Sequence, residues 1–156
     1  MNKLIFEYCF YAAVIILGLL ILGLMKRKNK LPSHQELKAK LESWAEKLKT
    51  LMREEESSAL TNFDFYKKVS KLLYRLDKLA YDTVQLAEKE RDMEIAGIAA
   101  LLESAQKELA PYKTGKGEGI QSAFSSVEAK ISDAIAITEQ ILLRDKEYKL
   151  RKKQDS

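Results

Sequence analysis

Apolar residues follow two patterns along the chain, a continuous run near the N-terminus and helical spacing afterwards. Residues Tyr8 to Met25 carry no charge, and Leu4 to Met25 contain only Glu7 as a charged side chain. A helix over the longer stretch would be about 33 Å long, enough to cross a hydrocarbon core of about 30 Å. The run exceeds the 7–15 apolar residues, roughly, of a cleaved signal peptide, which is the alternative interpretation. We therefore expect a transmembrane anchor over residues 1–25.

Four basic residues follow the apolar run directly: Lys26, Arg27, Lys28 and Lys30. Only Lys3 precedes the run as a basic side chain. The excess of positive charge after the span predicts a single-pass topology with the N-terminus outside and the C-terminal part in the cytoplasm. The same cluster, in a linker over 26–32, is also suited to anionic lipid headgroups.

Beyond the linker, apolar residues recur at spacings of three and four, which predicts amphipathic helices. Ser33 and Glu36 form a capping box, so a helix should cover about 34–56. Its expected seam is Leu37, Leu41, Trp44, Leu48 and Leu51. A last helix is expected over about 120–150, followed by a basic tail over 151–156. Its seam is Ile120, Phe124, Val127, Ile131, Ala134, Ile141 and Tyr148.

The middle of the chain, residues 62–109, contains no proline, and its one glycine, Gly97, costs a helix only about 1 kcal/mol. A single long helix is expected there, using one face early and another face late. The early seam is Phe65, Val69, Leu72, Leu76, Leu79 and Leu86, and the late one is Ile95, Ile98, Leu102, Ala105 and Leu109. A break in the charged stretch 88–92 is the alternative.

Short connections near residues 59 and 115 predict antiparallel neighbours. The fold class is therefore all-α, an elongated three-helix, coiled-coil-like bundle over 33–150, or a four-helix bundle if the middle helix breaks. In the three-helix arrangement the last helix covers Tyr81 near Tyr148, whereas Tyr74 lies opposite the frayed end of that helix and stays exposed. Because tyrosine is favoured at protein interfaces, Tyr74 and, second, Tyr81 are the candidate partner contacts.

Charge is distributed unevenly along the sequence. The first 30 residues hold five of the 27 basic residues and one of the 23 acidic ones, so the remainder contains 22 of each. A neutral remainder lacks the basic surface that nucleic-acid binding requires. We therefore expect no nucleic-acid partner.

The composition offers little to catalysis. One Cys and one His exclude thiolate or histidine-rich metal sites, and His34, in a helix cap, is expected to be exposed. The glycine-rich loop over 115–119 lacks the strand and the Lys-Ser/Thr pair of a phosphate-binding loop. Neither a metal, a cofactor nor enzymatic activity is expected.

These features together favour a membrane-anchored, non-catalytic interaction or scaffold subunit whose partners are the bilayer and another protein or a second copy. One alternative is an extracytoplasmic coiled-coil spacer linking membrane to envelope, like spanins or division proteins, which requires the opposite topology. The other is a sensor of a small ligand or lipid, suggested by the apolar last helix.

Overall fold

A computed structural model of the chain describes residues 11, 13–17, 30–57, 60–114 and 117–154. The chain forms two compact units, residues 1–31 and 32–156. In the first unit, residue 11 and residues 13–17 are helical, and the apolar side chains from Val14 to Leu17 are all exposed. Within the described ranges, no helix is both long and apolar enough to cross a membrane. Most of the predicted anchor over 1–25 lies outside the described residues.

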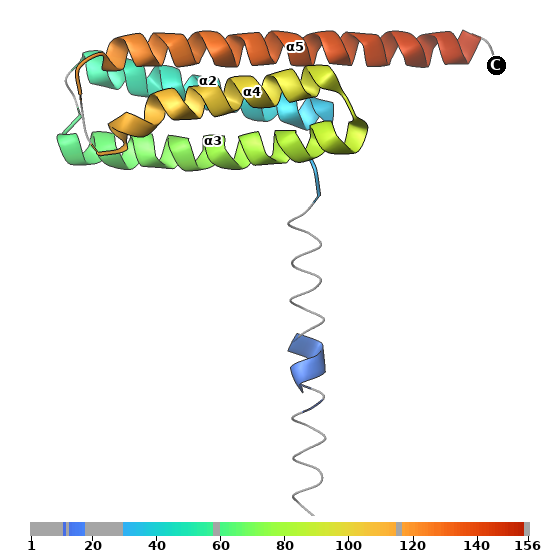
Figure 1. Ribbon diagram of the computed structural model, residues 1–156, viewed down its shortest axis with the longest axis horizontal. Coiled ribbons are helices and arrows are strands. Elements are labelled where there is room, and N and C mark those ends of the chain that lie inside the picture. Colours follow the sequence, from blue (N-terminus) through green and yellow to red (C-terminus); the bar gives the residue numbers. More distant parts are fainter. Residues whose placement is uncertain (1–10, 12, 18–29, 58–59, 115–116, 155–156) are drawn as a thin grey trace, which may run out of the picture. The chain divides into compact units, whose positions relative to one another are not determined.

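The second unit is an all-α bundle of four helices (Figure 1). They are α2 (His34–Glu56), α3 (Asn62–Glu90), α4 (Met93–Leu109) and α5 (Ile120–Gln154), with a 3-10 turn, η1 (Ala110–Thr114), after α4. Each helix packs on the next along the chain, and α5 closes the ring by packing on α2. The predicted helical bundle is confirmed, in its four-helix form.

The core of this bundle consists of the predicted seams. Every seam residue that the sequence indicated in α2, α3 and α4 is buried, and so are those of α5 up to Ile141. The phenyl rings of Phe65 and Phe124 lie 6.3 Å apart, centre to centre. At the start of α2, Ser33 and Glu36 form the expected capping box. Burial of these apolar stripes is the main stabilising contribution to the bundle.

The expected single helix over 62–109 is wrong, because the chain breaks after Glu90. Arg91 adopts the left-handed conformation (φ 54°, ψ 40°), and the Asp92 amide donates to the carbonyl oxygen of Ala87, as in a Schellman ending. The Asp92 carboxylate then accepts hydrogen bonds from the amides of Glu94 and Ile95, capping α4. The break allows both seams of this stretch to face one core.

Replacing Arg91 by glycine should stabilise the bundle. A side chain in the left-handed region costs about 1 kcal/mol, and glycine avoids that cost. We expect Arg91→Gly to raise the free energy of unfolding by about 0.5–1 kcal/mol, measured by urea denaturation of the full chain in detergent micelles. The matched control is Glu103→Gly in the interior of α4, which should lower it by about 1 kcal/mol. A loss of stability in both variants would contradict the proposed strain at Arg91.

The same break corrects the predicted pairing of the last helix. α5 packs on α4 and α2, diagonally across the bundle from α3. The expected cover of Tyr81 is therefore absent: Tyr81 is 65% exposed, and Tyr148 is exposed as well. α5 also remains helical to Gln154 and extends past the other helices at its C-terminal end (Figure 1).

Candidate functional site

A groove runs between α2 and α3. It consists of two adjoining hollows of about 370 and 310 Å³, which share Lys47 and Arg75. α2 and α3 make the least extensive contact of the four neighbouring helix pairs, which leaves this hollow between them. We call it the α2–α3 groove.

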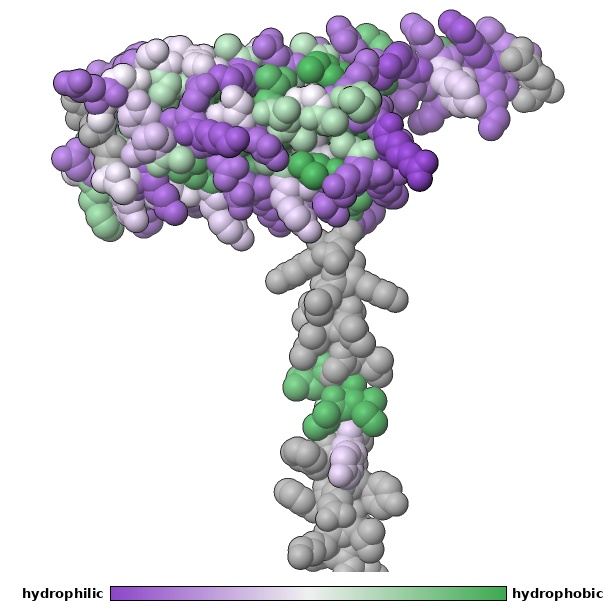
Figure 2. All heavy atoms as spheres, in the orientation of Figure 1, coloured by the Kyte–Doolittle hydropathy of each residue, from purple (hydrophilic) through white to green (hydrophobic). Residues whose placement is uncertain are grey.

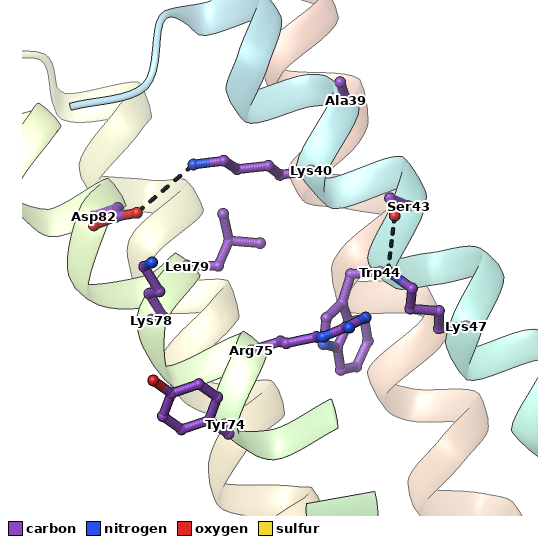
Figure 3. A pocket seen from close by; sticks show the side chains of 10 residues that line it. All are labelled: Ala39, Lys40, Ser43, Trp44, Lys47, Tyr74, Arg75, Lys78, Leu79 and Asp82. Atoms are coloured by element: carbon purple, nitrogen blue, oxygen red, sulfur yellow. Dashed lines mark hydrogen bonds and ion pairs between the residues drawn. The ribbon is translucent and has the colours of Figure 1, made fainter. Parts of the chain in front are cut away.

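Basic side chains dominate the walls of the α2–α3 groove. Six cationic and two acidic residues line it: Lys40, Lys47, Lys68, Lys71, Arg75 and Lys78, with Glu54 and Asp82. Lys40 pairs with Asp82 (3.8 Å) and Lys68 with Glu54. Figure 3 shows the first of these pairs and Arg75 extending from α3 toward α2. Among the described residues, Lys71, Arg75 and Lys78 form no ion pair, so their charge is uncompensated.

The floor of the groove is apolar and rigid. Trp44 is only 3% exposed, and its indole nitrogen donates a hydrogen bond to the carbonyl oxygen of Leu72 (3.0 Å). This bond ties α2 to α3 at the centre of the groove. Leu51, Leu72 and Leu79 complete the floor. A buried tryptophan held by a hydrogen bond has few rotamers left, so the floor is preorganised.

Of the two predicted contact tyrosines, one lies at the groove. Tyr74 lines it on the α3 side (Figure 3) and is 72% exposed, which agrees with its expected exposure. Tyr81 follows two turns later on the same helix and is also exposed. Of the headgroup cluster, Lys26, Arg27 and Lys28 lie outside the described residues; Lys30 is exposed. The face of the bundle seen in Figure 2 is mainly hydrophilic, with smaller hydrophobic areas among charged side chains.

The basic residues of the groove escaped the sequence analysis. Lys68, Lys71, Arg75 and Lys78 recur at spacings of three, four and three, which places them on one side of a helix. That spacing was a usable signal for a basic stripe on α3. The sequence does not indicate that Lys40 and Lys47 face this stripe, because their position opposite it depends on how α2 packs against α3.

A second cluster of charged residues joins three helices at His34. Its Nδ1 lies 2.9 Å from a carboxylate oxygen of Asp145 in α5, and its Nε2 lies 2.7 Å from one of Glu90 in α3. The side chain is only 19% exposed, so the expectation of an exposed histidine is wrong. Because ionised carboxylates only accept hydrogen bonds, both ring nitrogens can donate only in the protonated imidazolium. Partial burial lowers the pKa of His34, but the bonds and charges of Asp145 and Glu90 outweigh it and raise the pKa above 6.5.

This cluster predicts a pH-dependent stability near neutrality. A raised folded-state pKa means that the contribution is fully present below pH 6.5 and is lost as pH rises through the folded pKa. We expect a higher melting temperature at pH 6 than at about pH 8.5. The corresponding difference in the free energy of unfolding should be less than about 1 kcal/mol, because water screens the two pairs. The measurement is thermal unfolding of the full chain in detergent micelles. His34→Gln should remove most of the difference; an unchanged difference would assign it to another group.

The described residues contain no group of three or more His, Cys, Asp or Glu side chains placed to hold a metal ion. The α2–α3 groove offers cations to anionic groups and an apolar floor to an apolar side chain. No family model, curated protein sequence or solved structure matches the chain.

Proposed function

We propose that this protein is a membrane-anchored, non-catalytic docking subunit that presents the α2–α3 groove to a protein partner. The N-terminus lies outside and the helical bundle in the cytoplasm. The observation that carries the docking role is the α2–α3 groove itself, with uncompensated cations on its walls and the exposed Tyr74 at its edge. Tyrosine and arginine are the residue types that contribute most often to the energy of protein interfaces.

Membrane anchoring is supported by the N-terminal sequence and by the exposure of its described residues. Val14 to Leu17 are four successive apolar residues of a helix, so they cover all of its sides, and each is more than half exposed. An apolar surface on every side of a helix is stable in contact with lipid or with another protein. The charge-free stretch from Tyr8 to Met25 and the basic residues after it favour lipid.

The short connection between the predicted anchor and the bundle limits where docking can occur. From Met25 to Ser33 the chain spans at most about 28 Å when fully extended. A bundle attached in this way stays near the headgroups, which raises its effective concentration toward partners in the same membrane.

The topology follows from the basic cluster after the predicted span. A reporter that is active only in the cytoplasm, fused after Ser156, should therefore be active. Activity from a reporter that requires export would instead support the extracytoplasmic spacer, for which the 35-residue α5, about 52 Å long, would be suited.

Docking itself is tested by site-specific photo-crosslinking in intact membranes. A photoreactive phenylalanine analogue at Tyr74 should give a discrete adduct with another protein. The matched control is the same replacement at Tyr148, which is similarly exposed but lies on α5, away from the groove. Equal adducts from both positions, or none from Tyr74, would contradict docking at the groove.

A further inference from the structure

We infer that the α2–α3 groove binds an acidic amphipathic helix of the partner, with its apolar side on the groove floor and carboxylates along both edges. This inference rests on the proposed docking function and specifies the chemistry of the partner. Its three supports are the charge of the walls, the shape and length of the groove, and the recessed position of its apolar floor.

The charge of the groove is local. Its lining carries six cations and two carboxylates, whereas residues 31–156 as a whole contain equal numbers of basic and acidic residues. The cations come from both walls, with Lys40 and Lys47 on α2 and Lys71, Arg75 and Lys78 on α3. A ligand with carboxylates along two edges would therefore meet a cation on each side.

The shape of the groove fits a rod of helical length. Its lining extends from Ala39 to Glu54 on α2 and from Lys68 to Asp82 on α3. At 1.5 Å per residue this is about 22 Å, or four helical turns. A further helix laid between two neighbouring helices buries its apolar side in their groove, which is a common mode of peptide recognition.

The same shape argues against a flat anionic bilayer as the occupant. Trp44 and Leu79 are both buried at the bottom of the hollow, so a planar surface would contact the walls and leave the floor uncovered. Outside the groove, residues 31–156 hold 16 basic and 20 acidic side chains, and this net negative charge disfavours adsorption to anionic lipid. A narrow ligand can use walls and floor together.

Binding can be measured through Trp44, which is the only tryptophan of the chain and lies at the groove floor. The probe is a tryptophan-free peptide helix with a leucine stripe flanked by glutamates, titrated into the full chain in non-ionic micelles. The control peptide carries glutamine in place of each glutamate. We expect a change in Trp44 emission and an affinity for the acidic peptide at least about tenfold higher than for the control.

Charge reversal locates the binding. The double variant Arg75→Glu/Lys78→Glu should lose the preference for the acidic peptide, and a lysine-flanked peptide should bind it more tightly than the wild type. Lys107→Glu, an exposed lysine on α4, is the matched control and should retain the preference. Equal binding of the acidic and glutamine peptides, or the same loss with Lys107→Glu, would overturn the inference.

Two further results would distinguish the acidic helix from other occupants of the groove. Quenching of Trp44 by brominated phosphatidylserine, in nanodiscs that contain the full chain, would place the groove on the bilayer and would also overturn the inference. A discrete crosslink from Tyr74 combined with failure of the acidic peptide would leave the docking function standing and would reject the acidic helix as its partner.

Discussion

Leu76→Asp is expected to abolish the folded bundle. Leu76 is fully buried in the middle of α3, at the centre of the seam that faces the other helices. An aspartate there would have no cationic partner in the apolar core. Folding would require burial of its charged carboxylate or protonation of that carboxylate. The cost exceeds about 4 kcal/mol and approaches the total stability of a small domain. Circular dichroism of the full chain in detergent micelles should show loss of the cooperative thermal transition.

The matched control is Tyr74→Asp, two residues earlier on the same helix. Because Tyr74 is exposed, the new carboxylate stays in water. The free energy of unfolding should change by no more than about 0.5 kcal/mol. Cooperative melting of Leu76→Asp near the wild-type temperature would show that α3 presents a different face to the core.

Trp44→Ala is expected to have the second largest effect, a loss of about 3–5 kcal/mol. The indole is buried between α2 and α3, where it closes the floor of the α2–α3 groove and donates to the Leu72 carbonyl. Truncation removes its packing and leaves a cavity at the helix pair with the least extensive contact. Far-UV circular dichroism in urea measures the loss, since the fluorophore is absent from this variant.

Trp44→Phe separates packing from hydrogen bonding. Phenylalanine retains most of the apolar volume but cannot donate to Leu72, so we expect a loss of only about 1–2 kcal/mol. If phenylalanine and alanine cost the same, the hydrogen bond between α2 and α3, and not the packing of the ring, would determine the stability of the groove floor.

The core of this bundle could be predicted from the sequence because burial is decided by local periodicity. Residues such as Leu41, Leu48 and Phe124 repeat every three or four positions, and one side of a helix must then become apolar whichever helices it meets. The capping box at Ser33 and Glu36 is equally local, since both hydrogen bonds lie within one turn. The exposure of Tyr74 agrees with expectation but has a different cause: α5 packs on α4 and α2, so it covers neither Tyr74 nor Tyr81.

Only the tertiary structure decided how the helices pair and what lies between them. The break at Arg91 uses neither glycine nor proline; its strain is accepted because it lets Leu86 and Ile95 enter one core. With this break, α5 packs on α4, as the pairing with residues 80–110 predicts, and on α2 in place of the end of α3; Tyr81 is exposed and Asp145 lies beside His34. The α2–α3 groove likewise exists only where two helices meet. Local pattern determines which residues of a helix are buried, but the energies that choose its neighbours come from contacts between residues far apart in the chain.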